Sequence, residues 1–280
     1  MCYFCSVKKI SDIIAPITAE MARFEAFFAQ TLKADTEPMN SIMRYVTEAK
    51  GKRLRPILVL LGAKLFGEVN ALTLRAAAFV EMVHTATLIH DDVVDDDDQR
   101  RGHTSVKARF GNLSAVLAGD YLLAKAMLLL ANDTAILNEM LHTTAAMSEG
   151  ELIQEAVGLS YHGSRIDNEN GCHSVTALQP QYLDIITRKT AMLMQSCCAA
   201  GAMSVGATST QVEKIADFGL LLGQLFQMRD DLIDGDNAAT AQDLLPVYRS
   251  KALKVLEGFS PSETLEALKD LTAFCAEREA

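Results

Sequence analysis

Two short acidic motifs carry the clearest chemical signal in the sequence, and both have the pattern Asp-Asp-x-x-Asp. Their aspartates are Asp91, Asp92, Asp95, Asp230, Asp231 and Asp234. Residues four apart share one face of a helix, so each motif presents two carboxylates in neighbouring turns. Each motif also ends a long apolar segment, where the helix dipole disfavours negative charge. A bound cation would compensate, and Mg²⁺ prefers oxygen ligands of this kind.

Basic side chains accompany the acidic motifs at three other places in the chain. They are Lys52 and Arg55 in the segment GKRLRP, Arg100 and Arg101 after the first motif, and Lys189 beside Thr190. Arg makes bidentate contacts to phosphate and Lys acts as a point charge. A diphosphate and an aspartate repel each other by about 4 kcal/mol per charge pair at about 4 Å and an effective dielectric near 20, so a metal must bridge them. The pattern predicts a diphosphate site clamped by Mg²⁺.

Composition narrows the class of protein. The chain has 280 residues, 49% of them hydrophobic, which excludes intrinsic disorder. Its formal net charge of −10 disfavours a nucleic-acid-binding protein. The six cysteines suggest no disulfide framework. We find no signal-peptide pattern, and the uncharged run 190–212 is better explained by a buried helix than by a membrane span. A cytoplasmic location is therefore expected.

The periodicity of apolar residues is helical almost throughout. It predicts helices over 39–50, 55–66, 72–94, 112–130 and 133–157, a helix opened by a capping box at Thr210 and running to Ile233, and a last one opened by a box at Ser260. We expect an all-α protein with one domain over 1–280. Residues 1–38 form its N-terminal helical region, and the Gly-, Asn- and Ser-rich stretch 158–180 is a long loop.

The order and spacing of seven segments resemble the trans-prenyltransferase family of polyprenyl diphosphate synthases. The segments are GKRLRP (51–56), HTATLIHDDVVD (84–95), RRG (100–102), GD (119–120), GELIQ (150–154), KT (189–190) and GQLFQMRDDLID (223–234). The resemblance implies a single all-α bundle of the isoprenoid-synthase type around a deep central cavity. It also implies a homodimer.

The resemblance assigns roles position by position. Lys52, Arg55, His84 and Arg101 would hold isopentenyl diphosphate, and Arg100, Lys189, Thr190 and Gln227 would contact an allylic diphosphate. Asp91, Asp95 and Asp230 would bind Mg²⁺, with Asp92, Asp231 and Asp234 as further ligands or as groups that orient them. The allylic C–O bond would ionise, the isopentenyl double bond would attack the cation, and a proton would leave, adding one isoprene unit. Lys189 and Thr190 would stabilise the leaving group.

The family resemblance also bears on product length. Positions four and five before the first motif help to set the floor of the product tunnel in this family, and large aromatic residues there stop elongation early. Here these positions hold Thr87 and Ala86, which are small. We therefore expect a product longer than farnesyl diphosphate.

One segment departs from the family pattern. The stretch 235–246, GDNAATAQDLLP, contains no Lys or Arg, whereas family members usually carry lysines on the loop after the second motif. This leaves open a non-catalytic or weakly active regulatory subunit of a heteromeric synthase. A terpene cyclase is a further alternative, but it has no second diphosphate to hold and would not need GKRLRP, His84 and the arginine pair.

Overall fold

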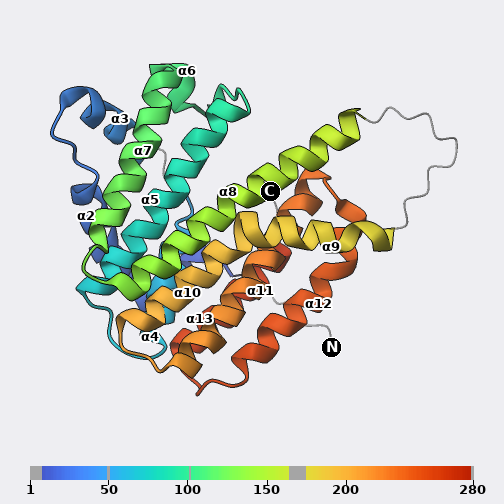
Figure 1. The fold of residues 1–280 in the computed structure, drawn as a ribbon. Coiled ribbons are helices and arrows are strands. Elements are labelled where there is room, and N and C mark those ends of the chain that lie inside the picture. Colours follow the sequence, from blue (N-terminus) through green and yellow to red (C-terminus); the bar gives the residue numbers. More distant parts are fainter. Residues whose placement is uncertain (1–7, 49–50, 101, 164–174, 279–280) are drawn as a thin grey trace, which may run out of the picture.

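The computed structural model describes residues 8–48, 51–100, 102–163 and 175–278, and helices dominate it (Figure 1). The first part of the chain contains α1 (Ile10–Ile13), η1 (Ala15–Ile17), α2 (Thr18–Thr31), α3 (Glu37–Glu48), α4 (Leu54–Lys64), α5 (Ala71–Val94), the two-residue strands β1 (Gln99–Arg100) and β2 (His103–Thr104), α6 (Val106–Phe110) and α7 (Asn112–Leu129). The second contains α8 (Thr134–Gly163), α9 (Val175–Ile186), η2 (Thr187–Ala191), α10 (Met192–Ser204), α11 (Ser209–Asp234), α12 (Ala238–Leu256) and α13 (Glu263–Glu277). The predicted all-α fold is confirmed.

Helix α10 occupies the centre of the bundle, where it packs against α4, α5, α8 and α11. Residues 196–202 of this helix are all Ser, Cys, Ala or Gly, so its neighbours can approach closely. Cys197 and Cys198 are fully buried, which confirms that the uncharged run holds a core helix. Burial raises the pKa of the Cys197 thiol to about 12, so this sulfur stays protonated and packs as a small apolar group.

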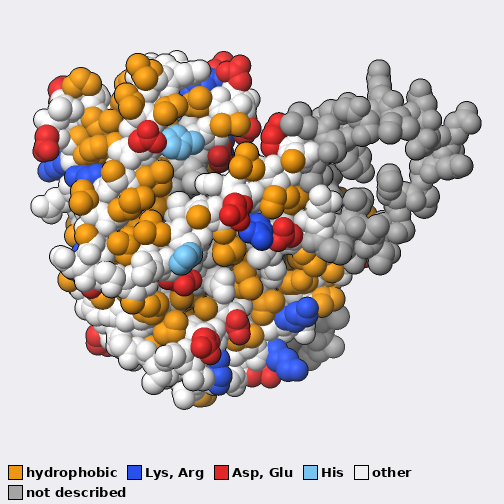
Figure 2. Space-filling view, in the orientation of Figure 1, with side chains coloured by type: hydrophobic (Ala, Val, Ile, Leu, Met, Phe, Trp, Pro, Cys, Tyr) orange, Lys and Arg blue, Asp and Glu red, His pale blue; other side chains and the backbone are white. Residues whose placement is uncertain are grey.

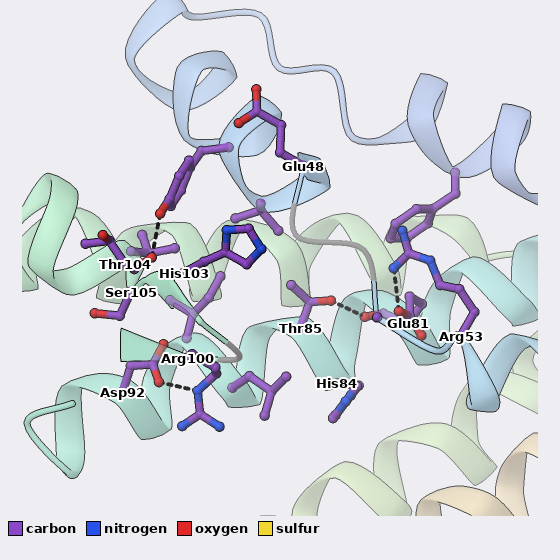
Figure 3. A pocket seen from close by; sticks show the side chains of 17 residues that line it. Glu48, Arg53, Glu81, His84, Thr85, Asp92, Arg100, His103, Thr104 and Ser105 are labelled. Carbon is purple, nitrogen blue, oxygen red and sulfur yellow. Dashed lines mark hydrogen bonds and ion pairs between the residues drawn. The ribbon is translucent and has the colours of Figure 1, made fainter. Parts of the chain in front are cut away.

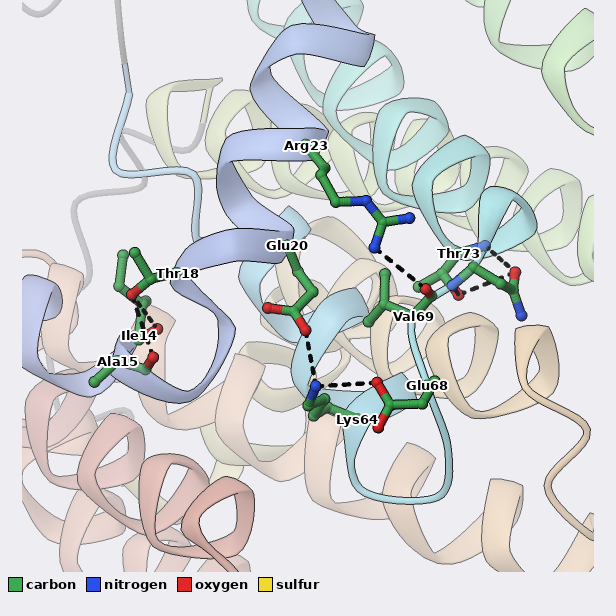
Figure 4. A network of polar contacts seen from close by, with 10 residues as sticks. Ile14, Ala15, Thr18, Glu20, Arg23, Lys64, Glu68, Val69 and Thr73 are labelled. Atoms are coloured by element: carbon green, nitrogen blue, oxygen red, sulfur yellow. Dashed lines mark hydrogen bonds and ion pairs between the residues drawn. The ribbon is translucent and has the colours of Figure 1, made fainter.

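The α4–α5 connection is fixed against the N-terminal helices (Figure 4). The Lys64 ammonium donates to Glu20 of α2 at 2.8 Å and to Glu68 at 3.2 Å. Asn70 then caps α5, because its side-chain oxygen accepts from the backbone N–H groups of Leu72 and Thr73. These contacts set the start of the helix whose far end carries the first acidic motif.

Two helix starts lie two residues from their predicted positions. The N-cap of α11 is Thr208, paired with Gln211, rather than Thr210 with Glu213. Two overlapping capping boxes compete in this sequence, and the earlier one forms. Likewise Ser262, not Ser260, caps α13 by accepting from the Leu265 N–H at 3.1 Å.

Two predicted irregular stretches are partly helical. Helix α8 continues to Gly163 and α9 begins at Val175, so both ends of the expected loop 158–180 are helical, and 164–174 lie outside the described residues. After the second motif, only 235–237 separate α11 from α12, and α12 includes Pro246. Propensity is a weak guide where flanking helices provide packing.

Candidate active site

The first acidic motif lies at the last turn of α5. Asp92 is buried and pairs with the Arg100 guanidinium on β1 (Figure 3). Asp91 is half-buried, and Asp95 is the exposed C-cap. The short β1–β2 hairpin returns the chain after the motif and positions Arg100 over it. Asp92 is therefore neutralised within the protein, and Asp91 and Asp95 remain for a cation.

Burial disfavours the ionised form of the Asp91 carboxyl group. Desolvation, with a smaller contribution from Glu151, raises the pKa of Asp91 to about 6, and the Lys189 and Arg100 cations oppose the shift. A carboxylate in this environment gains from a cation that restores the solvation it has lost. Glu151, on α8, thus brings a further acidic group to the first motif.

The second motif lies at the last turn of α11, where the carboxylates of Asp230 and Asp231 already have partners. Arg278, directly after α13, pairs with Asp230. The Tyr182 hydroxyl donates to Asp231 at 2.6 Å, and the Gln227 amide donates to it at 2.9 Å. Burial raises the pKa of both carboxyl groups, and these partners oppose the shift.

Lys189 and Thr190 lie on η2, a five-residue π-helical turn between α9 and α10. Such turns are rare and occur often at functional sites. Two glycines make room for it. A Cβ at Gly150 of α8 would lie 2.7 Å from the Arg188 Cβ, and one at Gly223 of α11 would lie 2.5 Å from the Ala191 Cα. These glycines explain the close packing of the predicted KT pair on α8 and on α11, the helix that carries the second acidic motif.

The Lys189 side chain contacts residues of α8, and the Thr190 side chain contacts a residue of α11. The Lys189 ammonium lies 2.9 Å from Glu151 and donates to Gln154 at 3.2 Å. The Thr190 hydroxyl donates to Gln227 at 2.8 Å, and Gln227 in turn holds Asp231. A chain of hydrogen bonds thus links Thr190 to the second motif.

Two cavities meet beside these groups. One, of about 320 Å³, is lined by residues that include Asp91, Thr87, Lys189 and Thr190. The other, of about 540 Å³, is lined by residues that include Lys52, Asp230 and Arg278. Arg55 and His84 line both cavities. Each cavity therefore combines one acidic motif with cations, and together they offer two adjoining places for anions.

Arg53 has a different role from its neighbours Lys52 and Arg55. It adopts a left-handed backbone with φ of 53° and donates to Glu81 at 2.6 Å (Figure 3). It also donates to Glu25 at 3.0 Å. It also lines a third, smaller cavity of about 170 Å³ that has a mostly apolar wall. Since two carboxylates neutralise its charge, Arg53 fixes the GKRLRP turn.

The donor set fits a hard cation that also holds phosphate. Within the described ranges, no three His, Cys, Asp or Glu side chains gather into a preformed metal cage. Mg²⁺ does not require such a cage, because it binds through one or two carboxylates and completes its shell with water and phosphate oxygens. Asp91 and Asp95 on one side, and Asp230 and Asp234 on the other, supply carboxylates of this kind.

The structure brings most of the predicted site residues together. Arg101 lies outside the described residues. Of the two tunnel positions, Thr87 lines the cavity beside Asp91, and Ala86 is fully buried. Sequence reasoning missed the roles of Arg278, Tyr182 and Glu151. Of these three residues, only Glu151 could have been found from the sequence, since it lies in the GELIQ segment that resembles the family pattern.

Comparison with known proteins places this arrangement in a family. The family model described as polyprenyl synthetase matches residues 36–243. The chain is 29% identical to an octaprenyl diphosphate synthase of Haemophilus influenzae, over 98% of this chain and 84% of the relative. It is 34% identical to a nonaprenyl diphosphate synthase of Mycobacterium tuberculosis, over 94% and 73%.

A solved structure agrees with these relatives. It is a polyprenyl synthase from Caulobacter crescentus, described as complexed with calcium and isoprenyl diphosphate, with a TM-score of 0.84 and 26% identity. The match covers 98% of this chain and 99% of that one. The chain thus belongs to the polyprenyl synthetase family, as its motifs predict.

Proposed function

We propose that this protein condenses isopentenyl diphosphate with an allylic diphosphate to give an all-trans polyprenyl diphosphate longer than farnesyl. One observation carries the proposal: two cation-lined cavities adjoin, each with one aspartate motif, and share Arg55 and His84. Joining two diphosphate substrates requires two anion sites whose organic ends meet. The octaprenyl and nonaprenyl diphosphate synthases among its relatives support a long product.

Different residues of the chain bind each of the two substrates. Lys52, Arg55 and His84 hold isopentenyl diphosphate in the larger cavity. The role that the family resemblance gives Arg101 concerns a position outside the described residues. Arg100, Lys189 and Thr190 hold the allylic diphosphate beside Asp91, and Gln227 orients Thr190. These cations stabilise the charge that develops on the departing diphosphate oxygen as the allylic C–O bond breaks. The isopentenyl π electrons then form the new C–C bond, and the diphosphate accepts the released proton.

We propose Mg²⁺ as the metal. Asp91 and Asp95 would hold it on one side and Asp230, with Asp234, on the other, while Asp92 and Asp231 are oriented by Arg100, Tyr182 and Gln227. Bound Mg²⁺ would supply charge neutralisation to the leaving diphosphate. The calcium in the Caulobacter crescentus complex supports a divalent cation in this fold.

We further propose a cytoplasmic homodimer that associates through α7. Both α5 and α7 are long and apolar enough to span a membrane, by length and composition alone; α5 is mostly buried, whereas only 28% of the apolar stretch of α7 is. Leu113, Leu117 and Leu128 are among the large apolar side chains it exposes, and hydrophobic groups gather over α7 in Figure 2. Such a patch favours a protein partner, and a second copy supplies a matching one.

The dimer can be tested apart from the chemistry. Leu117→Lys should halve the mass measured by analytical ultracentrifugation, because it places charge in the proposed interface. Val247→Lys, at another exposed apolar position on α12, serves as the matched control and should leave the mass unchanged. A monomeric wild-type protein would contradict the proposal.

The reaction is tested with radiolabelled isopentenyl diphosphate, Mg²⁺ and geranyl, farnesyl or geranylgeranyl diphosphate, followed by chromatography of the extracted lipid. We expect a ladder of products that ends at one length beyond farnesyl. A cyclic hydrocarbon formed without isopentenyl diphosphate would support the cyclase alternative. No product with any primer, from folded protein, would support the regulatory subunit and make the lysine-free segment 235–246 decisive.

A further inference from the structure

Arg278 makes a set of contacts that the proposed reaction does not use. Its guanidinium pairs with Asp230, lies 3.9 Å from the centroid of the Phe226 ring and donates to the Phe226 carbonyl at 3.4 Å. Its own carbonyl accepts from the Arg229 side chain at 2.8 Å. The Arg278 side chain is 9% exposed. This arginine is therefore fixed on one turn of α11, the turn that begins the second motif.

Arg278 also lines the larger cavity. The guanidinium lines it together with Lys52, Arg55 and His84, the residues proposed to hold isopentenyl diphosphate. Its Nε is buried and has no hydrogen-bond partner among the described residues. Because a buried donor without a partner is costly, this atom indicates an acceptor that the cavity would bring. A diphosphate oxygen is such an acceptor.

Arg278 and a metal ion compete for the same carboxylate. Mg²⁺ binds carboxylate oxygens at about 2.0–2.1 Å and tolerates little distortion. A guanidinium that already holds Asp230 repels a second cation there, so metal binding must weaken or break this ion pair. The released guanidinium would then face the cavity, whose described lining holds no carboxylate besides Asp230 and Glu81, and Glu81 already pairs with Arg53. An anionic substrate would therefore compensate the charge of Arg278.

We propose that Arg278 exchanges between Asp230 and the diphosphate of isopentenyl diphosphate, so that metal binding at the second motif and binding of this substrate strengthen each other. The inference rests on the proposed function. In this scheme Arg278 holds the second motif in its metal-free state, keeps the metal from binding tightly before the substrate arrives, and then binds the substrate diphosphate. Coupling of this kind is reciprocal, so each ligand must raise the affinity for the other by the same factor.

The experiment measures binding without turnover. Isopentenyl diphosphate alone cannot react without an allylic primer, so calorimetry can follow its binding with and without Mg²⁺, and the binding of Mg²⁺ or Mn²⁺ with and without isopentenyl diphosphate. In the wild type we expect the two ligands to raise each other's affinity about fivefold or more. Arg278→Gln should bind the metal more tightly in the absence of isopentenyl diphosphate, bind isopentenyl diphosphate more weakly, and reduce the coupling factor towards one.

Arg249→Gln is the matched control, because Arg249 lies on α12, pairs with Glu277 at 2.6 Å next to Arg278, and is absent from the lining of the larger cavity. It should behave as the wild type. Equal coupling in Arg278→Gln and wild type, or unchanged metal affinity without substrate, would overturn the proposal. Should Arg278→Gln fail to fold, Arg278→Lys keeps the charge but loses the planar fork, and it should show intermediate coupling; coupling equal to that of the wild type would refute the exchange.

Failure of the proposed function has a separate signature. If the wild-type protein made no product with any primer, the proposed elongation reaction would be refuted. Coupled binding of the metal and isopentenyl diphosphate, lost in Arg278→Gln, would still support the exchange by Arg278.

Discussion

The two aspartate motifs end helices of similar length, but the protein partners them differently. At the end of α5, Asp91 faces a cavity beside Lys189 and Glu151, and burial raises its pKa to about 6. At the end of α11, Asp230 is held by Arg278, and Asp231 by Tyr182 and Gln227. Under the proposed metal binding, Asp91 could therefore take a cation while Asp92 keeps its pair with Arg100, whereas Asp230 must first give up its pair with Arg278.

The residues four and five positions before each motif also differ between α5 and α11. Four and five positions before Asp91 the chain has Thr87 and Ala86, which are small. The same positions before Asp230 hold Phe226 and Leu225, and the Phe226 ring supports Arg278. Thr87 lines the cavity beside Asp91 and Ala86 is buried in the core, whereas Phe226 lines the larger cavity on the α11 side. We infer that the product extends along α5.

The largest expected effect is the loss of either motif's leading aspartate. Asp91→Ala and Asp230→Ala should each lower kcat by at least about a hundredfold, the loss typical of removing one charge-stabilising group from an active site. Their stabilities should differ. Asp230→Ala leaves the Arg278 guanidinium buried without its partner and should cost about 1–3 kcal/mol. Asp91→Ala removes a desolvated carboxylate and should not destabilise the fold.

Single-turnover assays and urea unfolding measure these two quantities, with helical content followed by circular dichroism. Wild-type turnover in both variants would refute the metal clamp. Equal stabilities would contradict the difference in partnering between the two motifs.

A smaller change, in product length rather than in rate, is expected from Ala86→Phe. The added ring should displace its neighbours towards the cavity that Thr87 lines and so shorten the product, which chromatography of the lipid would reveal. Because Ala86 is fully buried, the ring also overpacks the core by about 1–3 kcal/mol. Ala252→Phe, at an equally buried alanine of α12, controls for this cost and should leave the length unchanged. An unaltered product from Ala86→Phe would refute the tunnel assignment.

Much of this arrangement follows from the sequence, because local patterns fix it. The apolar period predicts the helices, and the acidic motifs mark the ends of α5 and α11 where the structure has them. Prediction fails where two local solutions compete. Both Thr208 and Thr210 stand three residues before a side chain that can close a capping box, and only the packed structure selects Thr208.

The partners of the second motif lie beyond local patterns altogether. Arg278 meets Asp230 across 48 residues and Tyr182 meets Asp231 across 49, through packing of α13 and α9 on α11. Nor does the sequence show that 187–191 form a π-helical turn, since this geometry depends on the close approach that Gly150 and Gly223 allow. Roles assigned to single residues from a motif thus need the tertiary contacts before their charge state is known.

The smallest effect tests the hydrogen bond that holds Asp231. Tyr182→Phe removes one donor to this carboxylate and leaves Gln227 in place, so stability should fall by about 1–2 kcal/mol. Because that hydrogen bond favours the ionised form, its loss should raise the pKa of Asp231 further, which a carboxyl ¹³C NMR titration can measure. Tyr248→Phe, at a similarly buried tyrosine of α12, is the control. If both variants lost equal stability and left the Asp231 titration unchanged, Tyr182 would be a packing residue, and the second motif would be held by Arg278 and Gln227 alone.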